Sequence, residues 1–484
     1  MDEFAFRALD SVTQAGASYA DVRLVETRER HVATKNGKIG NASSAGSLGL
    51  GIRVLVEGSW GFAATDELDS EGIGRAAKLA VEIARASAAA RNRPIELVPE
   101  ERFEVTWVSP IQIDPFTTSV EQNLDLLLAI DQELRRNPGV NLAETSLSFE
   151  RRRQLFVSSI GSAIDQTRYL TGAGFSALSY KDGEIQKRSY PNSFGGQYQL
   201  KGYELVHELK LLENAPRVAD EAVALHSAAQ CPEGQFDLIL DSSQLGLQIH
   251  ESIGHPIELD RVLGSEANYA GMSFLTLDKL GRLRYGSEIV NVVCDARLEH
   301  GPGLGTFAFD DEGVPAQRTD IIRGGQFVGY MTSRETAAAV GAGRSNGTMR
   351  ADGWARIPLI RMTNVSLMPG EQTLEEVFDT PDGIYMETNR SWSIDDKRFN
   401  FQFGCEIGWE IRDGKRVRML KNPSYSGITT EFWNSCAAIA DASHWTLWGT
   451  PNCGKGQPEQ VMGTGHGASP ARFRNVKIGG AYGA

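Results

Sequence analysis

One short segment limits how this chain can fold. Residues 245–260 read LGLQIHESIGHPIELD, so that His255 follows His250 by five positions and Glu251 stands directly after the first histidine. On an α-helix, side chains four positions apart point about 40° apart, whereas side chains five positions apart point about 140° apart. A straight α-helix would therefore turn the two histidines to different sides.

Two local structures would bring these histidines together. The helix can contain one π-type turn, whose i→i+5 hydrogen bond accommodates an extra residue. Alternatively, it can end near Gly254 and leave His255 in a left-handed or loop conformation. Gly254 and Pro256 flank His255 and favour such an interruption. We therefore predict a helix that starts with a serine N-cap at Ser242 or Ser243 and ends in a widened turn.

The H-E-x-x-x-H pattern suits metal chemistry. Neutral imidazoles bind Zn²⁺, and a glutamate beside one of them can accept a proton from metal-bound water. The alternative is that His250 packs in the core and His255 lies in a loop. A catalytic zinc also needs a third protein ligand and one open position, so a further donor must come from elsewhere in the chain.

Cys453 is the better candidate for that third ligand. It lies in NCGKG, where glycines allow the backbone to approach a metal and Lys455 would favour the thiolate. Glu258 would either support the site or lie on the surface. We interpret His466, a rival ligand within GTGHG, as part of a surface turn between glycines.

Composition limits the class of protein. A chain of 484 residues with 41% hydrophobic and 23% charged residues is typical of a globular protein with two or three domains. A net charge of −13 argues against nucleic acid as a partner. No apolar run is long enough to span a membrane, and the N-terminus lacks the features of a signal peptide. Five cysteines without a C-x-x-C pair indicate a reduced, cytoplasmic protein. We expect the four cysteines other than Cys453 to be small buried hydrophobic residues.

The first half of the chain repeats one order of elements. Helical periodicity at 3–15 and 68–91 encloses strand-like segments. A third helix at 119–136 starts a second run, in which strands are followed by one or two helices over 203–229. We expect turns at Asn36-Gly37 and in NASSAGSLG, which starts at Asn41. The pattern predicts an N-terminal α+β domain over 1–231, with a possible internal duplication.

Strand signals dominate the second half, 232–484. After a strand at 236–241 and the histidine helix, we expect mainly strands, with short helices at 333–341 and 428–441. Six of the eight tryptophans follow residue 350, which favours a barrel or sandwich core. The acidic segment 310–312 is interpreted as a solvated turn. The predicted fold class is α+β, with a helix and antiparallel-sheet domain followed by a β-rich domain that carries the metal site.

Four blocks in the second half carry a family resemblance. They read HESIGHPIELD, which ends in Glu258 and Asp260, then FDDEGVPAQRTDIIRGGQFVGYM, LIRMTN and NCGKGQP. Together, and in this order, they resemble the TldD/PmbA family of metalloproteases. The N-terminal segments ADVRLVE and GIRVLVEGSWGFAA are also similar to the family, so that the resemblance spans nearly the whole chain.

The resemblance implies a zinc ion held by His250, His255 and Cys453, with Glu251 as the general base. It implies hydrolysis of extended or unfolded peptides and a dimer around an internal cavity, formed with a second copy or with a metal-free PmbA-type paralogue. Because the metal residues are present, the chain resembles the TldD-type active subunit. The aromatic region 422–451 departs from the family and bears on substrate preference and the partner surface.

Two other functions are compatible with the same residues. A His₂Cys set with an adjacent glutamate is similar to that of peptide deformylases, which indicates hydrolysis of small amides. Alternatively, the zinc is structural and the protein is an assembly partner without turnover. A structural zinc would have a fourth protein ligand, such as His466 or Glu258.

Overall fold

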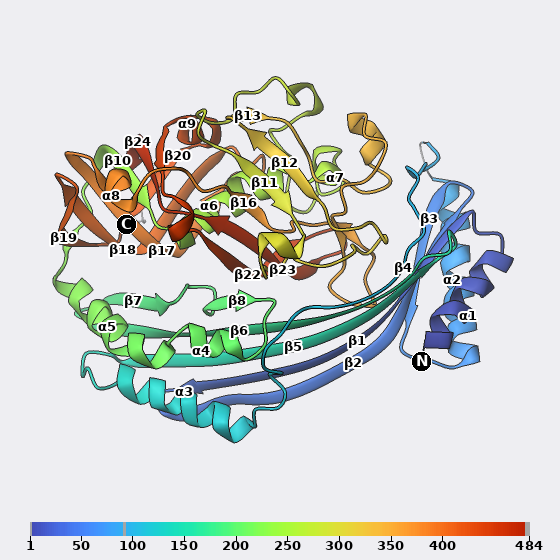
Figure 1. Cartoon of the computed structure of the whole chain (residues 1–484), viewed down its shortest axis with the longest axis horizontal. Coiled ribbons are helices and arrows are strands. Elements are labelled where there is room, and N and C mark those ends of the chain that lie inside the picture. Colours follow the sequence, from blue (N-terminus) through green and yellow to red (C-terminus); the bar gives the residue numbers. More distant parts are fainter. Residues whose placement is uncertain (1, 91–92, 480–484) are drawn as a thin grey trace.

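The computed structural model describes residues 2–90 and 93–479, which form a long curved sheet with a β-rich domain above its concave face (Figure 1). The helices are α1 Asp2–Gln14, α2 Ser70–Ala88, α3 Val120–Leu134, α4 Glu204–Glu208, α5 Leu211–Ala224, α6 Ser242–Ile249, α7 Leu259–Val262, α8 Leu374–Phe378 and α9 Thr429–Asn434. None of the helices among the described residues is both long and apolar enough to cross a bilayer.

The first sheet is built almost entirely from long antiparallel strands. Its order is β3-β2-β1-β5-β6-β4, and β7 and β8 also pair with β6. The strands are β1 Tyr19–Lys35, β2 Lys38–Val56, β3 Ser59–Thr65, β4 Glu104–Val108, β5 Leu142–Ser158, β6 Ala163–Lys181, β7 Glu184–Tyr190 and β8 Gln197–Gln199. The β4–β6 pair is parallel.

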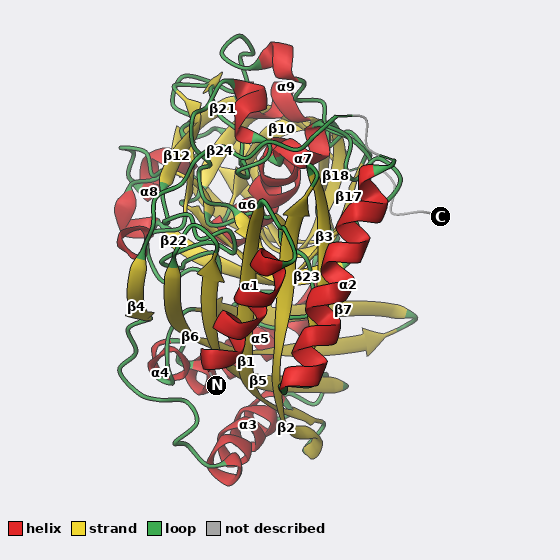
Figure 2. Ribbon diagram, turned by 90° about the vertical axis from the view of Figure 1, so that its right-hand side faces the viewer, coloured by secondary structure: helices red, strands yellow, loops and turns green. Residues whose placement is uncertain are grey.

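Helices cover the convex face of this sheet at two places (Figures 1 and 2). At one end, α1 and α2 bury small side chains such as Ala8, Ala77 and Ala80 against the sheet. At the other end, α3 and α5 bury Leu127, Val218 and their neighbours against β5 and β6. Alternation along each strand then directs the intervening polar side chains toward the second domain.

The predicted helices of the first half are confirmed, but one predicted turn is wrong. The segment that starts at Asn41 is the middle of β2, and it pairs with β1 residue by residue, for example Ser44 with Arg30. Its small residues are exposed because β3 pairs with β2 only from Leu50 onward. A helix, a run of strands and a further helix occur in this order twice, with three strands the first time and four the second. β1 and β5 meet antiparallel at the centre of the sheet. A duplication stays a prediction.

The second domain contains a closed ring of five strands, which confirms the predicted barrel. The ring order is β17-β10-β24-β20-β18, and β18 pairs again with β17. β9 and β19 extend the ring through β18, and β21 pairs with β24. These strands are β9 Ala229–Gln230, β10 Gly234–Leu240, β17 Asp382–Ile394, β18 Asn400–Arg412, β19 Lys415–Lys421, β20 Ser424–Ile428, β21 Cys436–Ile439 and β24 Ala471–Ile478.

Three small sheets lie beside the barrel. The order β13-β12-β11-β16 forms one of them, while β14–β15 and β22–β23 are two-stranded. Their strands are β11 Val292–Asp295, β12 Arg318–Arg323, β13 Gln326–Phe327, β14 Met349–Arg350, β15 Leu359–Ile360, β16 Val365–Leu367, β22 Thr446–Lys455 and β23 Gln460–Ala468. The predicted helix over 428–441 is too long, since α9 ends at Asn434 and β21 follows. All five cysteines are buried and free.

The acidic segment 310–312 joins the two domains, and its interpretation as a solvated turn is wrong. All three side chains are buried. Asp310 accepts the Glu312 and Val314 N–H groups, and Asp311 accepts Gln154 Nε2 from β5 at 2.6 Å. Such a segment is stable inside the protein because its charges are paired and hydrogen-bonded.

Arg53 of β2 provides the strongest of these pairings. Its guanidinium lies 2.6 Å from Asp21 of β1 and 3.0 Å from Glu312 of the second domain. All three side chains are at most 3% exposed. A single buried cation therefore holds one carboxylate from each domain.

We expect Arg53→Ala to lower the free energy of unfolding by about 3–5 kcal/mol, because it leaves two carboxylates buried without their cation. The matched control is Arg75→Ala on α2, whose pairs with Glu67 and Glu71 are exposed. That change is expected to cost at most about 1 kcal/mol. Urea denaturation measures both, and equal losses would contradict a central role for Arg53.

Candidate metal centre

The helix that follows β10 changes its winding at the first histidine. α6 is capped by Asp241, which accepts the Ser243 and Gln244 N–H groups, so the predicted serine cap is wrong by one or two positions. A π-helical turn then spans His250–Gly254, and a 3₁₀ turn spans His255–Ile257. The His255 N–H bonds to the His250 carbonyl, which is the i→i+5 hydrogen bond of the predicted widened turn.

Gly254 is required at this turn by close packing. A Cβ atom there would lie 2.1 Å from the Met362 sulfur. The left-handed alternative is wrong, since His255 has φ −65° and ψ −41°. The turn is thus a widened helix, and it brings the His250 and His255 rings to a centroid separation of 4.8 Å.

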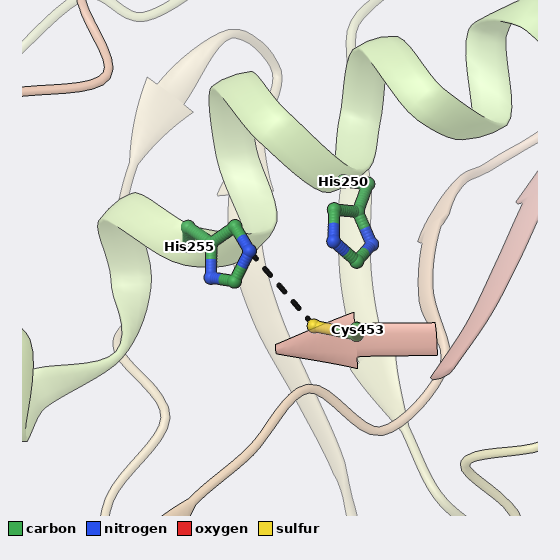
Figure 3. A group of neighbouring side chains, drawn as sticks. All are labelled: His250, His255 and Cys453. Atoms are coloured by element: carbon green, nitrogen blue, oxygen red, sulfur yellow. Dashed lines mark hydrogen bonds between the residues drawn. The ribbon is translucent and has the colours of Figure 1, made fainter. Parts of the chain in front are cut away.

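The structure brings His250, His255 and Cys453 together. One donor atom from each residue lies within 4.8 Å of the other two, and all three residues are buried. The Cys453 sulfur lies 3.9 Å from His255 Nε2. Figure 3 shows both rings reaching down from the helical turns toward Cys453 on β22. Tetrahedral zinc bonds of about 2.0–2.3 Å place two donor atoms about 3.3–3.6 Å apart. The 3.9 Å between the Cys453 sulfur and His255 Nε2 is close to this value, so small side-chain movements would let the three donors hold a metal.

A chain of hydrogen bonds determines which nitrogen of His250 is available. His466 Nδ1 lies 3.1 Å from the Val365 carbonyl and must donate to it. His466 Nε2 therefore accepts from His250 Nδ1 at 2.8 Å. His250 then carries its proton on Nδ1, and its Nε2 lone pair is free for a metal.

The interpretation of His466 as part of a surface turn is wrong. It lies within β23 and is fully buried. The glycines at 463, 465 and 467 alternate with larger residues, and Cβ atoms at these positions would collide with Leu304, Asn364 and Trp445 respectively. This period of two could have indicated a strand with one closely packed face.

Glu258 plays the corresponding part for His255. Its Oε2 lies 3.0 Å from His255 Nδ1, so that His255 also presents Nε2. Lys455, which is fully buried, lies 3.4 Å from Glu258 and 2.7 Å from Asp260. Lys455 therefore neutralises these carboxylates, and the prediction that it favours the Cys453 thiolate is wrong.

Electrostatics prepare the three donors for a cation. Burial lowers the pKa of His250 and lowers that of His255 well below the usual value, so both rings are neutral at pH 7. Burial acts to raise the pKa of the Cys453 thiol, but the charge of Arg361 and the contact with His255 outweigh it, and the pKa is lowered. Neutral imidazoles and a readily formed thiolate are the forms that bind metals.

Two arginines at the site were missed by sequence reasoning. Arg361 donates to the carbonyls of Cys453 and Gln460 and so joins β22 to β23. Arg398 lies 2.5 Å from Glu251 Oε2, in an ion pair with little exposure. Arg398 comes from the turn between β17 and β18, far from Glu251 in sequence, and no motif marks it.

Comparison with known proteins assigns the class and the family. The model of the PmbA/TldA metallopeptidase C-terminal domain matches residues 233–480, and that of PmbA/TldA metallopeptidase domain 1 matches residues 20–84. Both are domains of metallopeptidases. The chain belongs to the PmbA/TldD family, which confirms the resemblance carried by the four sequence blocks.

Curated relatives are similar over most of their length. A metalloprotease of Methanocaldococcus jannaschii is 29% identical, over 84% of this chain and 86% of its own. A Haemophilus influenzae protein named metalloprotease TldD homolog is 24% identical, over 97% of this chain and 95% of its own. A Saccharolobus solfataricus protein named zinc metalloprotease TldD homolog is 24% identical, over 98% of this chain and 99% of its own.

Solved structures share the fold. A Thermotoga maritima protein described as a modulator of a DNA gyrase aligns with a TM-score of 0.77 at 18% identity, over 99% of both chains. TldE from Thermococcus kodakarensis aligns with a TM-score of 0.71 at 16% identity, over 98% of this chain and 100% of its own. At this identity the likeness concerns the fold alone.

We expect Cys453→Ser to weaken Zn²⁺ binding by more than about 100-fold, which is the upper end of the loss from removing a supporting hydrogen bond. A serine hydroxyl keeps its proton at pH 7 and is a poor ligand for zinc. The matched control is Cys294→Ser, which changes a buried thiol that contacts Thr363. Competition with a chromophoric chelator measures the affinity, and unchanged binding by Cys453→Ser would contradict its role as a ligand.

Proposed function

We propose that this protein is a zinc-dependent peptidase that hydrolyses extended or unfolded peptides. The observation that carries the proposal is the convergence of His250, His255 and Cys453 in a buried cluster next to Glu251. The names of the relatives support metalloprotease activity for the family, and zinc appears in the name of the Saccharolobus solfataricus protein.

The donor set fits a catalytic zinc better than a structural one. Structural zinc sites have four protein ligands, whereas catalytic sites have three and one open position. His466 Nε2 accepts from His250, and Glu258 Oε2 accepts from His255, so these two candidate fourth ligands are already engaged. The remaining donors number three, which leaves a position for water or substrate.

Glu251 is the proposed general base. Zinc at the three donors would lower the pKa of a nearby water and polarise the scissile carbonyl. Glu251 would accept the water proton and deliver it to the leaving amine. The ion pair with Arg398 engages Oε2 and orients the carboxylate, and no described residue donates a hydrogen bond to Oε1. Oε1 is therefore the atom we propose for proton transfer.

The substrate is proposed to bind through its backbone. Over residues 38–49, β2 pairs only with β1 among the described residues, so its other edge is free. A free edge can accept an extended peptide as an additional strand, which tolerates many side chains. The cavity beside Ser43 and Ala45 of this strand also reaches Met462, which pairs with Cys453 across the β22–β23 hairpin.

We propose that the active form is a dimer, either of two copies or of this chain with a PmbA-type paralogue. The fold likeness to TldE, at a TM-score of 0.71, supports a related chain as partner. Light scattering of the purified chain, alone and mixed with such a paralogue, distinguishes the two assemblies.

We expect Glu251→Gln to lower kcat for cleavage of an unstructured peptide by about 10²–10⁴-fold, the usual contribution of a general base. Zinc content is expected to stay unchanged, because the three donors remain. The matched control is Glu431→Gln, which changes an exposed glutamate on α9 of the same domain.

Three results of this experiment would argue for other functions. Full activity of Glu251→Gln would exclude this glutamate as the base. Cleavage of formylated short peptides in preference to long unstructured ones would indicate a deformylase-like enzyme. Absence of turnover by the zinc-loaded wild type, alone and with a paralogue, would indicate an assembly partner.

A further inference from the structure

A cavity between the two domains has an unusual charge distribution. It encloses about 360 Å³ between the concave face of the first sheet and the β22–β23 hairpin, which carries Cys453. Leu170, Leu200 and Leu304 supply apolar wall. Four arginines also line it. Arg30 donates to the Thr118 carbonyl, and the other three are Arg152, Arg168 and Arg350.

The three guanidinium groups lie close together because of strand register. Arg152 of β5 pairs directly with Arg168 of β6, so both side chains are on the same face of the sheet. Arg350 of β14 approaches from the second domain and donates to the carbonyls of Met362 and Gly463 at 2.7 and 2.9 Å. Arg350 is thereby attached to Met362, whose side chain packs against Gly254 of the π-turn, and to β23.

None of these cations has a carboxylate of its own. Arg152 donates to the carbonyls of Ala351 and Asp352, and Arg350 donates to carbonyls alone. The Nε atoms of both are buried without a hydrogen-bond partner. For Arg168, no side-chain hydrogen bond or ion pair connects it to any residue in the described ranges. Its guanidinium is the one available to a ligand.

Asp311, whose charge acts on Arg168 and Arg350, is already engaged. It accepts Gln154 Nε2 and the Ala351 N–H, and it lies 3.7 Å from Arg23. Burial lowers the pKa of Arg350 to about 9, and the charges of Arg168 and Arg361 add to this effect. Burial and the charge of Arg152 also lower the pKa of Arg168. The charges of Asp311 and Glu150 act in the opposite direction on Arg168, but among the described residues no carboxylate forms an ion pair with any of the three arginines.

The same cavity has an acidic side. Glu29 of β1 and Glu150 of β5 are directly opposite each other in the sheet, and both line the cavity. Burial and the charge of Glu150 raise the pKa of Glu29. A ligand with several negative charges, such as phosphate, would be repelled by these glutamates. A single carboxylate can instead contact the arginines alone, while the rest of a peptide contacts the leucines and the polar wall.

We propose that this cavity binds a carboxylate of the peptide substrate, either an acidic side chain or the C-terminal carboxylate, through Arg168 with Arg152 and Arg350. The proposal rests on the proposed peptidase function and names a substrate class for it. Arg–carboxylate contacts are frequently bidentate and specific in geometry, so they would select peptides that carry a carboxylate. They would also fix the position of the peptide along the β22–β23 hairpin, which carries Cys453.

Binding is tested with zinc-loaded Glu251→Gln protein and fluorescein-labelled decapeptides. Three peptides share one sequence: one has an internal Glu, one has Gln at that position, and one has the Gln together with a C-terminal amide. We expect at least one of the two carboxylates to strengthen binding by about 10-fold. The difference in affinity between the Glu and Gln peptides measures the contribution of the acidic side chain. The difference between the Gln peptide and its C-terminal amide measures the contribution of the C-terminal carboxylate.

Arg168→Gln is expected to remove this preference while binding of the neutral peptide stays unchanged. The fold should tolerate the change, since the side chain has no partner to lose. Arg151→Gln is the matched control, because Arg151 adjoins Arg152 on β5 and therefore faces the other side of the sheet. We expect Arg151→Gln to keep the preference.

Equal affinity for all three peptides, or an unchanged preference in Arg168→Gln, would overturn the proposal. Inorganic phosphate that displaces every peptide equally, without any carboxylate preference, would assign the cavity to phosphate and also overturn it. Failure of the peptidase function has a separate readout, since the wild-type zinc protein is assayed for cleavage of the same peptides. A carboxylate preference lost in Arg168→Gln would support the site even without cleavage.

Discussion

The candidate metal centre depends on one backbone hydrogen bond, from the His255 N–H to the His250 carbonyl. This i→i+5 bond adds one residue to a helical turn and so turns two side chains five positions apart toward the same side. Gly254 allows the turn because Met362 occupies the space that a side chain there would need. With an ordinary α-turn, His255 would point away from Cys453, and the β22 strand would meet a single histidine.

Neighbouring segments then determine the chemistry of each donor. The Val365 carbonyl orients His466, His466 orients His250, and Glu258 orients His255. Each imidazole presents Nε2 to the same small volume as the Cys453 sulfur. Because every one of these groups is buried, the surrounding protein rather than water sets their protonation. The three donors are therefore held in the core of the second domain, between the β22–β23 hairpin and the widened turn that follows α6.

The two domains meet through buried charges that lie beside a small apolar cluster of Phe156, Ile164 and Phe309. Arg53 joins Asp21 to Glu312, and Asp311 lies between Gln154 and the backbone of Ala351. Arg168, which forms no ion pair among the described residues, lines the cavity next to the hairpin that carries Cys453. The concave face of the sheet thus positions the second domain, and it also forms a wall of the cavity that we propose for the substrate.

Much of this organisation was predictable from local pattern. Helical periodicity located α1, α2 and α3, the five-residue spacing of the histidines required a widened turn, and the family blocks pointed to Cys453. The amino-acid sequence by itself determined most of the elements of the first half, the family and the candidate donors, but not the strand over 41–49 or the end of α9. The tertiary structure alone decided the burial of His466, the choice of Arg361 rather than Lys455 beside the thiolate, the pairing of Arg398 with Glu251, and the burial of Asp310, Asp311 and Glu312. These contacts join residues distant in the chain, and a polar side chain looks the same in sequence whether water or a buried partner satisfies it.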